Sequence, residues 1–199
     1  MKGFYFITDS KLSKAGNISD VKNAVAAGVE VVQLREKNIS TKAFYLEALE
    51  LRQLCANTML LINDKVDVAL AVDADGVHLG QDDLPYYAAR KLLGTTKIIG
   101  ITVHDVEEAK EAEKMGADYI GVSPVFATST KTDAGRPSGI ILIEEIKKLV
   151  SLPVIAIGGI TLSNAPDVIK AGADGLSAIS AVITQPDVKQ EIEKFQRLF

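Results

Sequence analysis

Eight short apolar runs separated by longer amphipathic stretches dominate this sequence. The runs are nearly continuous in Val, Ile, Leu and Ala, which is typical of parallel strands that are covered on both faces. They span residues 4–7, 29–34, 59–62, 76–79, 97–101, 119–122, 154–157 and 175–178. Helical patterns lie between and after them at 18–27, 41–56, 66–72, 86–93, 106–115, 140–149, 164–171 and 188–198. The alternation predicts eight successive βα units in an α/β protein.

Three of the predicted helices end in similar phrases, which are Ala27-Gly28-Val29, Met115-Gly116-Ala117-Asp118-Tyr119 and Ala171-Gly172-Ala173-Asp174-Gly175. A glycine just past a helix takes the left-handed conformation that caps the last carbonyls. Such tight turns favour a repeated βα unit, and hence a single-domain (β/α)8 TIM barrel over residues 1–199. A doubly wound open sheet is the alternative. The lack of a second domain and of a Gly-rich loop after the first strand favours the barrel.

Composition limits the classes of function. The chain has 199 residues, 47% of them hydrophobic, which is enough to bury one sizeable core. A net charge of −4 with interspersed signs argues against a nucleic-acid-binding surface. No apolar run reaches the ~18 residues of a membrane span, and the N-terminus meets a charge too early for a signal peptide. The single cysteine, Cys55, is predicted to be a small core residue. We therefore expect a cytoplasmic protein; scattered apolar residues on the helix faces leave room for a homo-oligomer.

The loop predicted after the sixth strand, residues 123–135, concentrates polar groups. It places the hydroxyls of Thr128 and Thr130 next to the ammonium of Lys131. Hydroxyls and backbone N–H groups donate hydrogen bonds to an anion, and a lysine adds charge. The loop therefore suits a polyanionic ligand, although an ordinary polar surface loop has the same composition.

Other predicted strand ends carry polar groups as well. In a (β/α)8 barrel the loops after the strands gather on one face, where active sites lie. The groups are Gln33, Arg35 and Lys37 after the second strand, Asn63 and Asp64 after the third, His78, Gln81, Asp82 and Asp83 after the fourth, Thr102 and His104 after the fifth, Gly158 and Gly159 after the seventh, and Ile179 and Ser180 after the eighth. The aspartates are also plausible helix caps. Both histidines are set aside as more often structural.

Together these groups predict two anion sites. The glycines after the seventh strand and the small turn after the eighth, which opens a short helix, fit a phosphate site built from backbone N–H groups. Arg35, Lys37 and the loop after the sixth strand suggest a second site. Asp64 and Asp83 lie between, and two carboxylates attract a phosphate only through a cation. Few hard oxygen ligands beside a polyphosphate are typical of Mg²⁺.

The chain resembles thiamin phosphate synthases along essentially its whole length. The most specific motifs are Gln33-Leu34-Arg35-Glu36-Lys37, Leu61-Ile62-Asn63-Asp64, residues 75–83 and residues 124–131; residues 156–160 are shared with many relatives. The resemblance implies a transferase that joins 4-amino-2-methyl-5-hydroxymethylpyrimidine diphosphate to a thiazole phosphate, and releases pyrophosphate. It implies that the diphosphate leaves first and that the thiazole nitrogen attacks the resulting cation.

The resemblance also implies a role for each matched residue. Asp64 and Asp83 would hold Mg²⁺. Contacts to the diphosphate and the pyrimidine would come from Gln33, Arg35, Lys37, Asn63 and Lys131. The thiazole phosphate would contact Thr128, Thr130, Gly159, Ile179 and Ser180. Thr102 would contact substrate, and Arg35, Lys37, Thr102 and Lys131 would be the catalytic residues.

Two positions depart from the pattern of the family: Thr102 stands where serine is usual, and Phe126-Ala127-Thr128 replaces Phe-Pro-Thr. Both departures keep the hydrogen-bonding groups. Three alternatives remain, namely a thiazole tautomerase of the same superfamily, a phosphosugar isomerase or epimerase, and a non-catalytic regulator that binds thiamin phosphate. The cluster of Asp64, Asp83 and Lys131 favours the synthase, because a tautomerase has no use for it.

Overall fold

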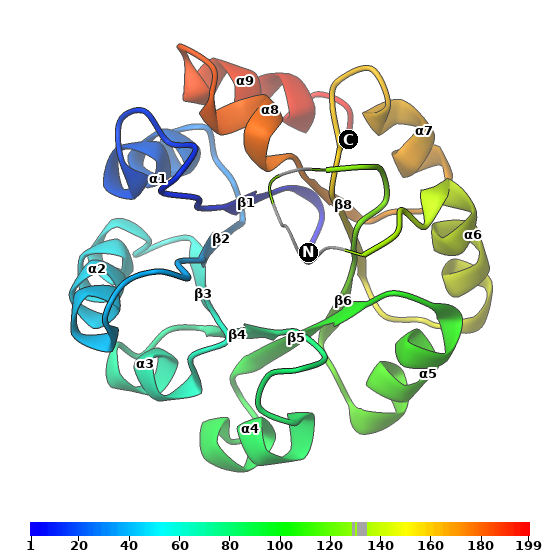
Figure 1. Ribbon diagram of the computed structural model, residues 1–199, viewed down its shortest axis with the longest axis horizontal. Helices are drawn as coiled ribbons and strands as arrows, with labels where there is room; N and C mark the ends of the chain where they lie inside the picture. Colours follow the sequence, from blue (N-terminus) through cyan, green and yellow to red (C-terminus); the bar gives the residue numbers. More distant parts are fainter. Residues whose placement is uncertain (129, 131–134) are drawn as a thin grey trace.

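Eight parallel strands close into a barrel in which each strand pairs with the next and β8 pairs with β1. The computed structural model describes residues 1–128, 130 and 135–199. Figure 1, a view along the barrel, shows the strands as an inner ring and the helices as an outer ring. The predicted (β/α)8 barrel is thus confirmed, and the open sheet is not formed.

The strands are β1 (Gly3–Ile7), β2 (Val31–Leu34), β3 (Met59–Asn63), β4 (Gly76–Leu79), β5 (Ile98–Val103), β6 (Tyr119–Val122), β7 (Val154–Ile157) and β8 (Gly175–Ser177). The helices are α1 (Asn17–Ala26), α2 (Thr41–Leu54), α3 (Val66–Ala71), α4 (Tyr86–Leu93), α5 (Val106–Met115), α6 (Gly139–Leu149), α7 (Ala165–Lys170), α8 (Ile179–Ile183) and α9 (Val188–Gln196). The fifth strand runs further than predicted, so Thr102 lies inside it rather than beyond its end. The second strand begins two residues later than predicted, at Val31.

The hydrophobic core has two parts. The larger part lies between the sheet and the surrounding helices, and it includes Cys55 as predicted. The smaller part fills the inside of the barrel with Tyr5, Ile7, Val31, Leu61, Tyr119 and Ile155. Side chains from inside a parallel barrel normally pack in layers. Here the apolar filling gives way, toward the carboxyl ends of the strands, to polar side chains.

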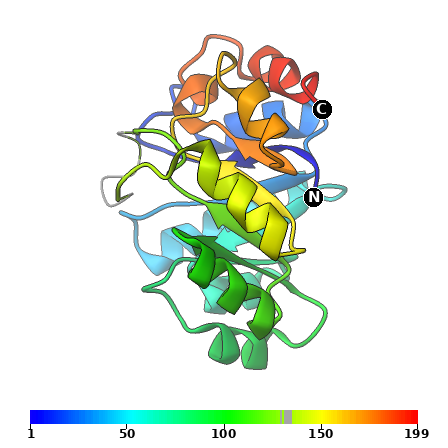
Figure 2. The same ribbon diagram turned by 90° about the vertical axis from the view of Figure 1, so that its right-hand side faces the viewer.

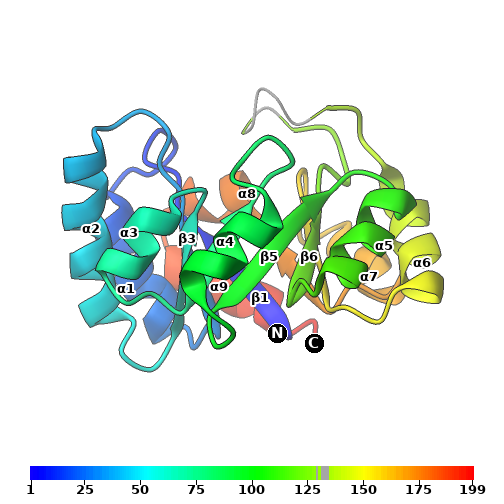
Figure 3. The ribbon, with the colours of Figure 1, turned by 90° about the horizontal axis from the view of Figure 1, so that it is seen from below.

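The two ends of the barrel differ in their loops. Three glycines follow helices with left-handed φ angles, 78° at Gly28, 93° at Gly116 and 107° at Gly172, and they make the predicted tight turns into the next strands. Both termini lie at this amino-terminal end, as Figure 3 shows, and the loop between β6 and α6 lies at the opposite end. The side view in Figure 2 shows the same separation. No helix in the described part of the chain is long and apolar enough to cross a membrane.

Three similar clusters, each of one aspartate with a backbone N–H and a cationic side chain, lie at the amino-terminal end of the barrel. Asp75, Asp118 and Asp174 stand directly before the even-numbered strands β4, β6 and β8. Each carboxylate accepts a backbone N–H from the start of the preceding strand, namely from Leu60 at 2.7 Å, Ile99 at 2.8 Å and Val154 at 2.8 Å. Each also pairs with a cation of a nearby helix, namely Arg52 at 2.6 Å, Arg90 at 2.7 Å and Lys147 at 2.9 Å. We call these three units the base clusters.

Candidate active site

One pocket at the carboxyl ends of the strands gathers the predicted site residues. It is lined by twelve of them, namely Gln33, Arg35, Lys37, Asn63, Asp64, Asp83, Thr102, Thr128, Thr130, Gly159, Ile179 and Ser180. The thirteenth, Lys131, lies outside the described residues. With the solvent at its mouth, the pocket has an empty volume of about 830 Å³.

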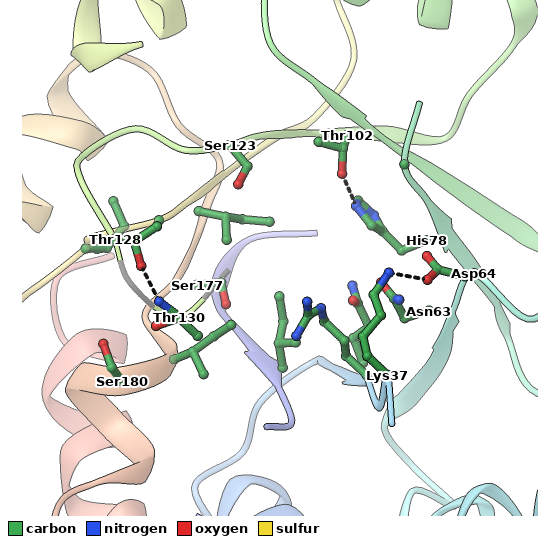
Figure 4. A pocket seen from close by; sticks show the side chains of 18 of the residues that line it. Lys37, Asn63, Asp64, His78, Thr102, Ser123, Thr128, Thr130, Ser177 and Ser180 are labelled. Atoms are coloured by element: carbon green, nitrogen blue, oxygen red, sulfur yellow. Dashed lines mark hydrogen bonds and ion pairs between the residues drawn. The ribbon is translucent and has the colours of Figure 1, made fainter. Parts of the chain in front are cut away.

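The pocket has two halves of different chemistry, which face each other in Figure 4. The half built by β2, β3 and β4 carries the charged side chains of Arg35, Lys37, Asp64 and Asp83. The half built by the loop after β6 and the ends of β7 and β8 carries hydroxyls and backbone groups. We call them the charged half and the hydroxyl half.

In the charged half, Asp64 is held toward the pocket by its backbone. Its φ of 63° lies in the left-handed region, which aspartate tolerates better than most residues and which is common at functional sites. The Asp64 carboxylate accepts a hydrogen bond from the Lys37 ammonium at 2.8 Å. The N-cap of α3 is Lys65, without a side-chain cap. The helix-cap interpretation of Asp64 is therefore wrong.

Asp83 stands next to Asp64. Its carboxylate accepts the N–H of Gly80 at 2.6 Å, and the N-cap of α4 is Pro85, so the capping interpretation is wrong here too. Burial raises the pKa of Asp83, and a hydrogen bond with Asp64 raises it further, against the opposing effects of the Gly80 N–H and of Lys37. Two carboxylates in contact need a shared proton or a cation between them.

This pair fits a divalent cation of the magnesium type. The described residues contain no group of three or more His, Cys, Asp or Glu side chains that could hold a metal. Two carboxylate ligands are enough for Mg²⁺, which usually keeps waters and takes further oxygens from phosphates of the substrate. Asp64 and Asp83 are thus the residues that could hold the cation, and the Mg²⁺ site stays a prediction.

Arg35 is fixed at the edge of the pocket by residues of the β1 end. The hydroxyl of Thr8 donates to the Arg35 carbonyl at 3.1 Å and accepts the Arg35 N–H at 2.9 Å. The Arg35 guanidinium lies 3.9 Å from the carboxylate of Asp9. Asp9 in turn accepts the backbone N–H groups of Lys11 and Leu12. Thr8 thus fixes the Arg35 backbone, and the Asp9 carboxylate lies near the guanidinium.

The hydroxyl half is built around two glycines with φ angles of 98° at Gly158 and 64° at Gly159. A Cβ on Gly159 would lie 2.7 Å from the carbonyl oxygen of Ala127, and one on Gly158 would lie 2.8 Å from Pro124. The N–H of Phe126 also donates to the Gly158 carbonyl at 3.0 Å. Both glycines are therefore needed to seat the loop after β6 on the end of β7.

Donors surround the space above these glycines. Ile179 and Ser180 are the first residues of α8, where backbone N–H groups lack acceptors within the helix. On the facing loop, Thr128 accepts the N–H of Thr130 at 3.2 Å. The buried hydroxyl of Ser177 has no hydrogen-bond partner among the described residues. A phosphate group would satisfy donors of this kind.

A continuous chain of buried hydrogen bonds runs beneath the pocket. The amide nitrogen of Gln33 donates to the Tyr5 hydroxyl at 2.7 Å, and the hydroxyls of Tyr5 and Tyr119 lie 2.8 Å apart. The Tyr119 hydroxyl lies 2.8 Å from Nδ1 of His78. Nε2 of His78 lies 2.8 Å from the Thr102 hydroxyl. We call this chain, from Gln33 to Thr102, the buried relay.

The sequence interpretation missed most of the buried relay. It left His78 outside the site, whereas the structure places His78 in the pocket wall. His104, also set aside, is exposed and bonds Glu108. A signal was present in the mid-strand glycines, which often mark a close approach of other groups. A Cβ on Gly100 would lie 2.0 Å from the Tyr119 ring, and one on Gly121 would lie 3.1 Å from the His78 ring.

Comparisons with known proteins agree with this architecture. A family model described as thiamine monophosphate synthase matches residues 4–182. The chain is 55% identical to a thiamine-phosphate synthase of Methanosarcina barkeri over 96% of this chain and 88% of the relative. It is 48% identical to one of Chloroflexus aurantiacus over 98% of this chain and 91% of the relative.

A solved structure is similar as well. The thiamine phosphate pyrophosphorylase from Pyrococcus furiosus superimposes with a TM-score of 0.91 at 41% identity, over 98% of this chain and 94% of that one. A family model over most of the chain and identity of this level over nearly its whole length leave one assignment: the chain belongs to the thiamine monophosphate synthase family.

Proposed function

We propose that this protein is a thiamin phosphate synthase, a transferase that joins 4-amino-2-methyl-5-hydroxymethylpyrimidine diphosphate to 4-methyl-5-(2-phosphoethyl)thiazole and releases pyrophosphate. The observation that carries the proposal is the contact between Asp64 and Asp83, flanked by Arg35 and Lys37 and facing the hydroxyl half. One half suits a diphosphate with its cation, and the other suits a monophosphate. A reaction between two phosphorylated substrates needs both.

In the charged half, Asp64 and Asp83 would hold Mg²⁺, which when bound neutralises charge on the diphosphate. The C–O bond between the pyrimidine methylene and the diphosphate breaks, and the electron pair leaves with the diphosphate. Arg35 and Lys37 stabilise the charge that develops on its oxygens. Lys131, which lies outside the described residues, is proposed to act with them. Preorganised cations of this kind lower the barrier without a strong general base.

The two rings are held on either side of the breaking bond. Gln33, Asn63 and Thr102 are proposed to orient the pyrimidine above the buried relay. Thr128, Thr130, Gly159, Ile179 and Ser180 are proposed to hold the thiazole phosphate. The thiazole nitrogen then donates its electron pair to the methylene carbon, and a C–N bond forms. Holding both rings in line makes this step effectively unimolecular.

A thiazole tautomerase is the nearest competing function. It would need the hydroxyl half, but it has no diphosphate that would require two adjacent carboxylates and two cationic side chains. A non-catalytic regulator would bind the product without turnover. The contact between Asp64 and Asp83 favours the synthase over both.

The decisive experiment measures pyrophosphate and thiamin phosphate together, with each substrate alone, with both, and with or without Mg²⁺. We expect equal amounts of both products, formed only when both substrates and Mg²⁺ are present. Tautomerisation without pyrophosphate would identify the tautomerase, and binding without turnover would identify the regulator. A His104→Gln variant, altered at an exposed residue outside the pocket, is the matched control and should be fully active.

We further propose that the enzyme works in the cytoplasm on these two small molecules, without nucleic acid or a membrane as partner. The buried free thiol of Cys55 is compatible with a reducing compartment. Gel filtration with light scattering would test whether the enzyme forms a homo-oligomer.

A further inference from the structure

The buried relay has a direction, which follows from counting its hydrogens. The Gln33 amide nitrogen can only donate, so the Tyr5 oxygen accepts from it at 2.7 Å. The Tyr5 hydroxyl hydrogen then points to its other neighbour in the relay, the Tyr119 oxygen. The Tyr119 hydrogen must in turn point to Nδ1 of His78.

The remaining hydrogens follow from this start. With Nδ1 of His78 accepting, a neutral ring carries its hydrogen on Nε2, and Nε2 donates to the Thr102 oxygen at 2.8 Å. The hydroxyl hydrogen of Thr102 is then left for another acceptor. Thr102 lines the pocket, where a bound ligand can supply that acceptor.

Burial keeps the hydroxyl groups of the two tyrosines protonated. Tyr5 and Tyr119 are buried, and desolvation raises the pKa of each hydroxyl above its ordinary value. Both therefore remain neutral donors near pH 7. A neutral hydroxyl buried inside the barrel favours an arrangement that uses its hydrogen, because a buried donor without an acceptor is not compensated for its lost hydration.

The barrel also reserves space for these rings. A Cβ on Gly100 would lie 2.0 Å from Cζ of Tyr119, and a Cβ on Gly121 would lie 3.1 Å from Cε1 of His78. The absence of a side chain at these two glycines thus leaves the space that the rings of Tyr119 and His78 occupy. Its ring is also in contact with those of Tyr5 and His78, at centroid distances of 5.9 and 5.5 Å.

We propose that Tyr119 is a positioning residue that holds His78 in the Nε2–H tautomer, and thereby makes the Thr102 hydroxyl a hydrogen-bond donor to the substrate in the pocket. The ligand atom beside Thr102 is then an acceptor, such as an unprotonated ring nitrogen. An aminopyrimidine offers such a nitrogen next to an amino donor. This identification of the ligand atom rests on the proposed function; the tautomer does not.

The chain makes the tautomer easy to measure, because it has only two histidines. The ¹⁵N NMR spectrum of protein labelled at histidine, without ligand and at a pH near 8, distinguishes Nε2–H, Nδ1–H and doubly protonated rings. His104→Gln removes the exposed histidine and assigns the remaining signals to His78. We expect the Nε2–H form in the wild-type protein.

Two matched variants test the direction. Tyr119→Phe removes the donor to Nδ1, so the His78 hydrogen should move wholly or partly to Nδ1. Tyr5→Phe leaves the Tyr119 hydroxyl free to donate, so the Nε2–H form should persist. For Tyr119→Phe we expect kcat to fall about 10–100-fold with little change in KM. Removing the hydrogen-bond partner that orients a metal-bound histidine has an effect of this size in metalloenzymes.

The outcomes separate this inference from the proposed function. A wild-type His78 that is Nδ1–H or doubly protonated would overturn the inference, whether or not the variants fold. An unchanged Nε2–H signal in folded Tyr119→Phe, verified by thermal unfolding, would also overturn it. If the expected tautomers appear but no thiamin phosphate is formed, the relay stands and the proposed function fails.

Discussion

At the amino-terminal end of the barrel each base-cluster carboxylate has two partners, whereas at the opposite end two carboxylates face each other. Asp118, for example, accepts from the Arg90 guanidinium at 2.7 Å and from the Ile99 N–H at 2.8 Å. Asp64 has the Lys37 ammonium at 2.8 Å, but it also contacts Asp83, whose pKa is raised. Both ends contain acidic residues at the ends of strands, so residue type alone does not separate them.

The two ends differ in how far groups of the protein itself meet the hydrogen-bonding capacity of the carboxylates. A carboxylate whose acceptor capacity is met by the protein contributes to stability and has little left for a ligand. Carboxylates that are short of positive charge destabilise the folded chain until a cation binds, which is common in functional sites. We therefore expect substitutions at the two ends to separate activity from stability.

The largest effect is expected for Asp64→Asn and Asp83→Asn. Each should lower turnover at least 10²–10³-fold, because the diphosphate charge is no longer neutralised as it develops.

The same variants are expected to affect stability differently from turnover. Since the pKa of Asp83 is raised on folding, its protonation favours the folded state at low pH, and that contribution is lost as pH rises through the raised pKa. Asp83→Asn should therefore be at least as stable as the wild type at neutral pH. Pyrophosphate-release kinetics and urea unfolding measure the two effects, and normal turnover in either variant would contradict the metal assignment.

A smaller effect is expected from ligand linkage. Magnesium with inorganic pyrophosphate at a hundredfold excess over Kd should stabilise the wild-type protein by about 2.7 kcal/mol. Asp64→Asn should lose this stabilisation, whereas Asp118→Ala at the other end should keep it. Thermal unfolding with and without the ligands gives the answer, and equal shifts in both variants would show that the two ends are not separate.

A loss of stability without a loss of turnover is expected for Asp118→Ala. It leaves the N–H of the buried residue Ile99 without an acceptor, which costs about 1–3 kcal/mol. The half-exposed pair with Arg90 adds little. Urea unfolding measures the change, and Asp73→Asn, at a fully exposed aspartate whose ion pair in the described part of the chain is with Lys97, is the control with little expected change. A drop in kcat equal to that of Asp83→Asn would contradict the division.

The smallest effect tests whether the base clusters act separately. Burial raises the pKa of the Cys55 thiol to about 11, so the thiol reacts with alkylating reagents only after local opening. Arg52, which contacts the Cys55 carbonyl and Asp75, should slow that opening. Arg52→Ala should speed labelling about two- to fivefold, the factor expected for a loss of up to ~1 kcal/mol. Lys147→Ala breaks the corresponding pair beside β8, and an equal acceleration there would mean that labelling reports global unfolding.

Much of the fold follows from sequence because the signals are local. Strands covered on both faces read as continuous apolar runs, and Gly28, Gly116 and Gly172 mark the turns wherever they occur. The pocket follows too, since parallel strands place the residues after them on one face. Gln33, Arg35 and Lys37 line the pocket because of their spacing along one extended segment.

The rest depends on contacts between distant segments. Tyr5 and Tyr119 look like ordinary core aromatics in a strand, and only the closed barrel brings their hydroxyls to 2.8 Å. Gly159 looked like a phosphate-binding glycine, and the structure adds its tight packing against Ala127. Two of the base-cluster aspartates, Asp118 and Asp174, stand in turn phrases visible in the sequence, but their partners come from another helix and strand.

Gly100 and Gly121 have a consequence for mutational tolerance. Neither has a side chain that could touch a substrate, yet even alanine would push into the rings of Tyr119 or His78. In a saturation-mutagenesis selection for growth without thiamin, Gly100 would accept almost no substitution and would score like Asp64 and Asp83, and Gly121 would accept fewer substitutions than an ordinary strand residue. A position can thus be intolerant because of the volume it leaves empty, and such positions are found by measuring what a methyl group would meet.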